Sequence, residues 1–389
     1  MKEIKNLKKA ADLIKKTLAK NGKIVIFGDA DLDGSTSALL LEEAIRNVNP
    51  TADLLVYFSE WESSDYGLNK QALQALKVHA PALLIVVDCG IGNFEELLIA
   101  KAMGFTTIVI DHHEILDALP KADLIIDPKQ KGDHYPFKKL TTVCLVYRLS
   151  QFLLGKNFSS FLEQSFAELA ALGTIADMMP EEDLNAVLVG KGAATIKQTQ
   201  RPGLKAMIQV AVLGESSARE IFKKLSLILN ISPVTNHLTE CYLLLKTASQ
   251  EEAMVLAKKL LSEADKRNQE IYEITEIVSQ RAQQSLSPII FEGDESWQRV
   301  FSGAIASRIC NKYKKPTFIF KRDIQKCRGS VRVPKNIDAV VALKSCASLL
   351  LMYGGHPPAA GFTVSSENVD DLKKCLEKYF NEMYGKNNN

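Results

Sequence analysis

The sequence predicts an α/β protein with two domains: an N-terminal domain on a mostly parallel sheet and a smaller C-terminal α/β domain, joined by a long connector helix. Three observations support this fold class. Short, continuously apolar runs alternate with amphipathic segments over residues 23–127. One apolar stripe with spacings of three, four and seven residues runs through 251–282, and a second strand-and-helix alternation follows it. Continuous apolar strands are typical of parallel sheets that helices cover on both faces.

The first region contains strand-like segments at 23–27, 53–58, 82–87, 106–110 and 124–126. Helical periodicity is present at 35–48, 70–78 and 93–103, and again from 141 to 208. Three of the strands lead into an aspartate, which is Asp29, Asp88 or Asp111. Because open α/β sheets bind ligands beyond the carboxyl ends of their strands, this repetition predicts a functional site there.

We expect three parts along the chain: an N-terminal domain over 1–200, a helical connector over 201–284 and a C-terminal domain over 285–380. The apolar positions from Ala253 to Ile277 lie on one face of the connector helix. Such a stripe is typical of a helix that packs against a domain.

The composition is that of an ordinary globular protein, with 46% hydrophobic and 24% charged residues among 389. The first residues lack the apolar core of a secretory signal, and no apolar run approaches the roughly 20 residues of a membrane-spanning helix. The seven cysteines are scattered and form no Cys-x-x-Cys pair. We therefore expect a cytoplasmic protein with reduced thiols and no membrane partner.

The net charge of +2 hides a strongly basic block. Between Arg299 and Lys335 there are eleven lysines or arginines and one acid, Asp323. A block of this kind can attract a polyanion such as nucleic acid. The alternative is a solvated face without a binding role.

A first cluster of carboxylates, Asp29, Asp31 and Asp33, lies at alternate positions between a strand and a helix. Because unpaired buried charges are very costly, the three carboxylates need cations or solvent. An EF-hand loop starts similarly, but its twelfth position is a glutamate, and the corresponding residue here is Leu40. The cluster thus indicates a metal site other than a calcium loop, or else a surface turn without metal.

Three more clusters carry metal-binding residue types. Asp88 ends a strand, where an aspartate can also be a helix N-cap. His112 and His113 are adjacent between acids, and Asp177 ends an apolar helical run. Together the four clusters offer enough ligands for two divalent ions, which can activate water and stabilise both oxygens of a phosphoryl displacement. Mixed aspartate and histidine ligands favour manganese, with magnesium, iron or zinc as alternatives.

The order of DADLDG (29–34), VVDCG (86–90), DHH (111–113) and ALGTIAD (171–177) resembles the four motifs of the DHH phosphoesterases. Two later segments, RGSVR (328–332) and GGHPPAAGF (354–362), resemble the C-terminal substrate-binding domain that accompanies them. The form GGH-x-x-AAGF is nearer to the RecJ-like single-strand exonucleases than to the short-oligonucleotide or cyclic-dinucleotide branches.

The resemblance implies a metal-ligand set of Asp29, Asp31, Asp33, Asp88, His112 and Asp177. Asp31 would bind one ion, with Asp29 as a further ligand or a neighbouring contact. Asp33 would bind the other ion, which His112 and Asp177 complete. Asp88 would bridge both ions and so belong to the catalytic residues.

His113 is the second catalytic residue that the resemblance implies, placed near the scissile phosphate. The implied substrate-binding residues are Arg308, Arg328, Ser330, Arg332, Gly354, Gly355 and His356. The arginines would contact the nucleic-acid backbone, and the glycines would let the protein backbone approach a phosphate. On this basis 1–200 would be catalytic and 285–380 substrate-binding.

The function that the resemblance implies is a metal-dependent exonuclease for single-stranded DNA or RNA, working from the 5′ end in DNA repair, recombination or replication. Replication or repair proteins are the expected partners, as for an archaeal-type relative that lacks the OB-fold of bacterial RecJ. Two arginines of the RecJ pattern are missing, one within Thr235–Thr239 and one within 59–65. A phosphodiesterase for short oligonucleotides, a nucleotide phosphatase and a replication scaffold are the alternatives.

Overall fold

The structure, a computed structural model, describes residues 3–59, 67–115 and 118–386. Most of the arginine-free segment at 59–65, together with Tyr66 after it, lies outside the described residues. The chain divides into two compact units, Met1–Ala264 and Asp265–Asn389. The separate connector at 201–284 therefore remains a prediction.

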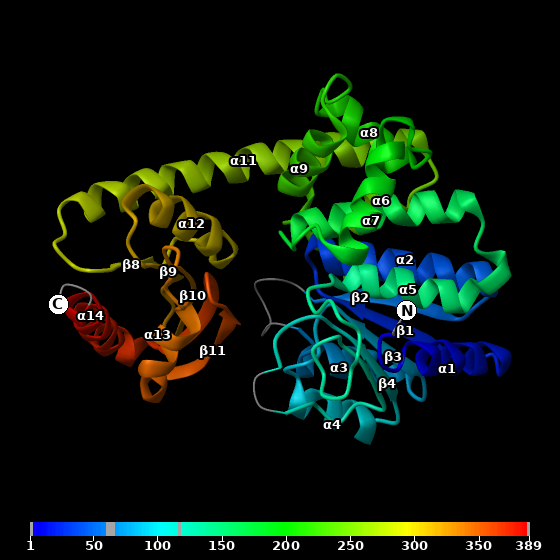
Figure 1. The fold of residues 1–389 in the computed structure, drawn as a ribbon, viewed down its shortest axis with the longest axis horizontal. Helices are drawn as coiled ribbons and strands as arrows, with labels where there is room; N and C mark the ends of the chain where they lie inside the picture. Colours follow the sequence, from blue (N-terminus) through cyan, green and yellow to red (C-terminus); the bar gives the residue numbers. More distant parts are fainter. Residues whose placement is uncertain (1–2, 60–66, 116–117, 387–389) are drawn as a thin grey trace. The chain divides into compact units, whose positions relative to one another are not determined.

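The first unit is built on a five-stranded sheet that is parallel throughout (Figure 1). Its strands, in spatial order, are β2 (Leu54–Phe58), β1 (Ile24–Gly28), β3 (Leu83–Val87), β4 (Thr106–Ile110) and β5 (Leu124–Ile126). These bounds agree with the five expected strands to within one residue. All the carboxyl ends thus lie at one edge of the sheet.

Helices cover both faces of this sheet because each central strand is apolar on both sides. Along β1, Ile24 and Ile26 pack under α2 and α5, whereas Val25 and Phe27 pack under α3 and α4 (Figure 1). The helices of this unit are α1 (Leu7–Ala19), α2 (Leu32–Val48), α3 (Lys70–Leu76), α4 (Phe94–Ala102), α5 (Thr142–Leu154), α6 (Ser160–Ala176), α7 (Asp183–Thr195), α8 (Pro202–Val210), α9 (Ala218–Leu229) and α10 (Glu240–Lys246). A small hairpin, β6 (Val234–Thr235) and β7 (Leu238–Thr239), lies between α9 and α10.

The second unit has a mixed five-stranded sheet in the order β11-β12-β10-β9-β8. The strands are β8 (Ile290–Asp294), β9 (Thr317–Lys321), β10 (Lys326–Arg332), β11 (Leu350–His356) and β12 (Ala359–Ser365). One face packs on α12 (Ser302–Tyr313), and the other on α13 (Ala339–Ser345) and α14 (Val369–Lys386). The long helix α11 (Gln250–Gln283) runs across the boundary of the two units, as its apolar stripe predicts.

Two features differ from the sequence expectations. Helix α2 begins at Leu32 rather than at Ser35, because the Asp31 carboxylate caps it by accepting a hydrogen bond from Gly34 N (2.9 Å). The expectation of reduced thiols is wrong at one pair, since Cys346 and Cys375 form a disulfide between the end of α13 and α14. Within the part of the chain that the structure describes, no helix is long and apolar enough to cross a membrane.

Candidate metal centre

Three neighbouring strands deliver the carboxylates and histidines to one place. Asp29 follows β1, Asp88 follows β3, and His112 follows β4 after one intervening residue. The backbone ladder continues into these residues, since Asp29 N donates to Val87 O and Asp88 N donates to Ile110 O. The ligand-bearing backbone is therefore as firmly held as the sheet itself.

The structure brings together the seven candidate residues of the first unit. Their ligating atoms form three groups, each within 4.8 Å: Asp29 with Asp31 and Asp88, Asp33 with His112 and Asp177, and Asp88 with His112 and His113. Asp88 belongs to two of the groups. Its φ of 63°, which is uncommon for a residue with a side chain, marks a strained position at the strand end.

Two buried carboxylate oxygens in this cluster lack a hydrogen-bond donor within the described ranges. Asp88 Oδ1 and Asp177 Oδ2 each lie 3.5 Å from His112 Nε2, and neither oxygen accepts a hydrogen bond there. Leaving a buried acceptor unsatisfied is costly. Oxygen and imidazole atoms that converge in this way fit a divalent cation of the manganese or magnesium type.

The electrostatics of the cluster point the same way. Burial and then the neighbouring Asp177 and Asp31 raise the pKa of Asp33 well above its usual range. Burial and the surrounding aspartates do the same for the pKa of Asp88. Burial, followed by Asp31, raises the pKa of Asp177 to about 7. Because so many carboxylates cannot all be ionised together, the cluster needs either protons or cations.

Long-range contacts hold Asp33 in place inside the first turn of α2. Its Oδ2 accepts from Thr142 N (2.9 Å) and its Oδ1 from Val143 N (3.0 Å), so that this side chain also satisfies the start of α5. A Cβ on Gly173 would meet Asp33 Oδ1 at 2.8 Å. Gly173, in the motif at 171–177, therefore allows α6 to pack closely against Asp33 at the start of α2.

Asp111 contacts both histidines of the cluster in a way that the sequence does not reveal. Its Oδ1 accepts from His113 Nδ1 (2.7 Å) and from His112 N (2.7 Å), and its Oδ2 accepts from Ile91 N (3.0 Å). Burial opposes a charge on His113, but Asp111 raises the pKa of that histidine to about 9. Asp111 thus orients the histidine pair. The only feature of the sequence that pointed to this residue was its position at the end of a strand.

Lys129 also approaches the cluster, from the loop after β5. Its Nζ donates to His112 O (2.5 Å) and pairs with Glu114 Oε1 (3.0 Å). Nothing in the sequence pattern distinguishes this lysine from other basic residues. Its place follows from the neighbouring positions of β4 and β5 in the sheet.

In the second unit, Arg328, Ser330 and Arg332 alternate along β10 and so share the face on which α12 packs. Ser330 Oγ lies 2.9 Å from Ser302 Oγ at the start of α12. Across the sheet, Ser330 is paired with Gly361, and Gly361 is paired with Gly354. A Cβ on Gly361 would have only Gly329 O within 4 Å, at 3.8 Å, so the backbone beside Ser330 is open there.

The other substrate-binding candidates are placed as follows. Gly355 has a φ of 140°, and a Cβ there would meet Ala359 O at 2.5 Å, so the position requires glycine. Arg308 is exposed on α12, and burial lowers the pKa of Arg332. His356 ends β11 and its backbone pairs with Ala359 of β12, but its side chain lies outside what the structure describes.

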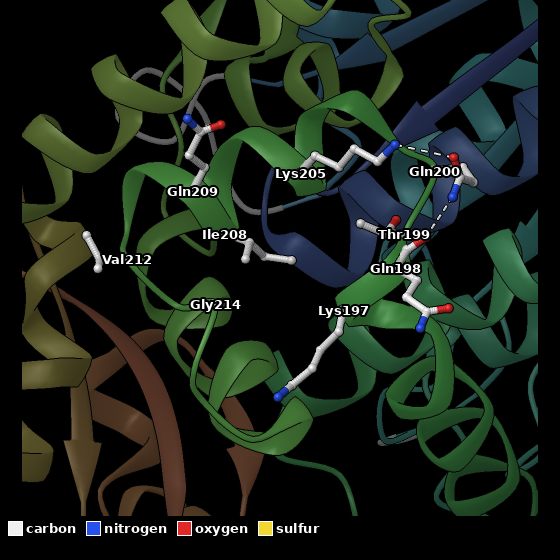
Figure 2. A pocket seen from close by; sticks show the side chains of 9 residues that line it. All are labelled: Lys197, Gln198, Thr199, Gln200, Lys205, Ile208, Gln209, Val212 and Gly214. Atoms are coloured by element: carbon white, nitrogen blue, oxygen red, sulfur yellow. Dashed lines mark hydrogen bonds between the residues drawn. The ribbon is translucent and has the colours of Figure 1, made fainter.

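A pocket of 560 Å³ lies elsewhere in the first unit, around α8 (Figure 2). Two hydrogen bonds join lining residues: Lys205 Nζ donates to Gln200 Oε1 (3.3 Å), and Gln200 Nε2 donates to the backbone oxygen of Gln198 (2.8 Å). Figure 2 shows the Lys197 and Gln209 side chains pointing in opposite directions. With neither a carboxylate nor a histidine in its lining, the pocket lacks groups for phosphoester chemistry.

Comparisons with known proteins agree with this geometry. Residues 23–174 match the DHH family N-terminal domain, and residues 282–382 match the DHHA1 domain. The chain is 32% identical to the single-stranded-DNA-specific exonuclease RecJ of Bacillus subtilis, covering 97% of this chain and 48% of that protein. It is 29% identical to RecJ of Thermus thermophilus, covering 97% of this chain and 54% of that protein. The chain thus spans about half the length of these two relatives.

Solved structures show the same likeness. A crystal structure of exonuclease RecJ bound to manganese matches with a TM-score of 0.80 and 27% identity, over 97% of this chain and 95% of that one. RecJ from Thermus thermophilus with Mn²⁺ matches with a TM-score of 0.84 and 26% identity, over 97% of this chain and 55% of that one. The chain thus carries a DHH domain followed by a DHHA1 domain, in the expected order, and over nearly its whole length it is similar to the RecJ exonucleases.

Proposed function

We propose that this chain is a metal-dependent exonuclease that hydrolyses single-stranded DNA from its 5′ end with two divalent cations, of which Mn²⁺ is preferred over Mg²⁺. One observation carries the proposal. Asp88 Oδ1 and Asp177 Oδ2 converge on His112 Nε2 at 3.5 Å, buried and without a donor among the described residues. Such a cluster is unfavourable until cations bind to it.

The three ligand groups support a division between two ions. Asp29, Asp31 and Asp88 would hold the first ion, and Asp33, His112 and Asp177 would hold the second. Asp88 lies within reach of both the first group and the histidines, which supports a bridging role. Divalent cations at this place supply activated water and neutralise charge that develops on the leaving oxygen.

The histidine next to the cluster has a role of its own. Asp111 occupies Nδ1 of His113, so Nε2 is the nitrogen that can meet a substrate phosphate. Because Asp111 raises the pKa of His113 to about 9, the ring carries a proton at neutral pH in the metal-free protein. A protonated imidazole can donate to a phosphate oxygen and stabilise negative charge there.

The second unit supports a nucleic-acid substrate. Arg328 and Arg332 flank Ser330 on β10, and Ser330 is paired with the exposed Gly361. Cations beside bare backbone are suited to phosphates and do not distinguish DNA from RNA. The choice of DNA follows the names of the RecJ relatives. A cytoplasmic location and replication or repair partners complete the proposal.

The test is digestion of 5′-labelled and 3′-labelled single strands, DNA and RNA, from about 3 to 30 nucleotides long, with Mn²⁺, Mg²⁺ or EDTA. Metal-dependent trimming of long DNA from the 5′ end, absent in Asp88→Ala, is the expected result. Turnover limited to the shortest strands would favour an oligonucleotide phosphodiesterase. Equal and negligible turnover by the wild type and Asp88→Ala would leave only a scaffold role.

A further inference from the structure

The β6–β7 hairpin presents a histidine at a position where its turn disfavours a side chain. The two strands pair as Val234 with Thr239 and Thr235 with Leu238, which leaves a two-residue turn of Asn236 and His237. Both turn residues have positive φ, 51° and 61°. Glycine is the usual residue at the second position of such a turn, so His237 costs free energy there. An observed strain of this kind motivates a functional hypothesis.

The hairpin is anchored to the loop and helix that carry the metal-binding residues. Asn230 Oδ1 accepts from Leu32 N (3.2 Å) on one side of the hairpin. On the other side, Thr239 Oγ1 lies 2.9 Å from Ser35 Oγ, in a buried contact. Both contacts are with residues at the start of α2, next to Asp31 and Asp33. The hairpin is therefore fixed on both sides to the segment that carries Asp31 and Asp33.

The turn itself lies at the carboxyl end of the sheet. His237 O accepts from Phe58 N (2.8 Å), and Phe58 is the partner of Gly28 at the end of β1. Asp29 follows directly. Neighbouring strands are about 5 Å apart, so the backbone of His237 lies about 10 Å from that of Asp29. This is close enough for contact with a nucleotide that flanks the bond being cut.

The His237 side chain is exposed, and its ring is stacked on another aromatic ring. It stacks on Tyr57, with ring centroids 4.2 Å apart and an interplanar angle of 15°. Tyr57 is buried and stacks in turn with Phe27 of β1 at 5.9 Å. His237 itself is exposed, so the ring column that begins in the core ends at the surface with an imidazole face. A rigid, exposed aromatic face of this type is what stacks with bases of single strands.

We propose that His237 is a positioning residue that stacks on a base of the single strand next to the scissile phosphate, and that it acts through binding rather than chemistry. This rests on the proposed function. The base flanking the cut is thereby gripped by its π face, which every base has, so the contact does not depend on sequence. It also does not require a phosphate on the strand end.

The experiment compares His237→Gly with His237→Phe in the full chain. Glycine suits a φ of 61°, so His237→Gly removes the ring without straining the turn. His237→Phe keeps a flat ring without the nitrogens. The matched control is His134→Ala, which removes an exposed histidine from the loop after β5. The substrates are identical single DNA strands with one abasic site moved through the first few nucleotides from the digested end.

Two readouts are needed. The Kd of labelled strands is measured by fluorescence anisotropy in EDTA, where metal-dependent cleavage does not occur. KM and kcat are measured with Mn²⁺. We expect His237→Gly to raise Kd and KM about tenfold for the intact strand, with a much smaller change in kcat. An abasic site at one position should weaken wild-type binding and leave His237→Gly unaffected. His237→Phe and His134→Ala should resemble the wild type.

The inference is overturned if His237→Gly binds intact strands as tightly as the wild type does. It is also overturned if the Kd of His237→Gly exceeds that of the wild type by the same factor on every abasic strand. A loss confined to kcat, or failure of the wild type to bind single strands, also overturns it. The anisotropy measurement separates this outcome from failure of the proposed function. Wild-type protein that shows the base-dependent binding but no metal-dependent cleavage would retain the stacking residue and refute the exonuclease.

Discussion

The two units differ in the sign and the burial of their charged side chains. In the first unit, Asp88 and His112 are buried just beyond strand ends and Asp33 is buried in the first turn of α2, and burial, followed by the neighbouring aspartates, raises the pKa of both carboxylates. In the second unit, Arg308 of α12 is exposed, and Arg328 and Arg332 of β10 are half-buried. A fully buried set of charges depends on each member, whereas charges that reach solvent contribute in small, screened increments. Substitutions should therefore act in an all-or-none manner in the first unit and in a graded manner in the second.

The largest effect is expected for Asp177→Ala in the first unit. This change removes one of the unpartnered oxygens at His112 and with it a ligand of the proposed second ion. Loss of several kcal/mol of transition-state stabilisation corresponds to roughly a thousandfold lower rate. Steady-state digestion with Mn²⁺ measures the rate, and calorimetric titration counts the bound ions. Two ions bound with an unchanged rate would remove Asp177 from the ligand set.

A smaller effect is expected for Asp111→Asn, which keeps the shape of the side chain but weakens its hold on His113. Residues that orient ligands typically contribute about 10–100-fold in activity or metal affinity. The matched control is Asp123→Asn at the other end of β4, where the carboxylate also accepts a backbone hydrogen bond, from Thr107 N (2.8 Å). Equal losses in the two variants would reduce Asp111 to a structural role.

Graded effects are expected in the second unit. Arg328→Ala and Arg332→Ala should each weaken binding of single strands about tenfold at low salt, because each removes a phosphate contact. The slope of log Kd against log salt should become shallower by roughly one contact, about 0.7. Lys344→Ala, on α13 across the sheet, should leave both unchanged. An all-or-none loss from either arginine would contradict the contrast between the units.

The smallest effect concerns stability without metal. The folded-state pKa of Asp177 is raised to about 7, mainly by burial, whereas its unfolded value is near 3.9. The stability that comes from its bound proton is therefore complete below about pH 4 and is lost as the pH rises through about 7. In EDTA the Tm should fall from about pH 5 to about pH 8, by a few degrees.

Adding Mn²⁺ at about pH 8 should restore the Tm, because the cation binds carboxylates that have lost their protons. Differential scanning calorimetry measures both series. Asp177→Asn should flatten the pH dependence in EDTA. A Tm that rises with pH in EDTA, or that ignores Mn²⁺, would contradict the buried like-charge cluster.

Much of the fold could be predicted because its signals are local. The β-branched run at 106–110 and the apolar run at 124–126 each lead into an aspartate, and β4 and β5 begin and end where these runs do. The stripe at 251–282 predicts α11 to within a residue at each end. Residue type and spacing are properties of short segments, so they indicate strands, helices and the metal-binding chemistry without knowledge of packing.

Other features could not be predicted, because they depend on partners far away in the chain. Asp33 satisfies the start of α5 through a hydrogen bond from Thr142 N, 109 residues away in the chain. The disulfide joins Cys346 and Cys375 across 29 residues without any motif. In the sequence, His237 lies in a segment where an arginine of the RecJ pattern is absent, and nothing else marks it. Only its stack on Tyr57 reveals an exposed aromatic face.

The sequence by itself thus determined the α/β class, the order of the DHH motifs and the residue types that suit divalent cations. Only the tertiary structure decided which carboxylate oxygens lack a donor, how Asp111 holds His113, and that a hairpin from after α9 reaches the end of β2. The physical reason is that strand and helix signals arise between neighbours in sequence. Burial, unsatisfied acceptors and stacked rings arise between segments that meet when the chain folds.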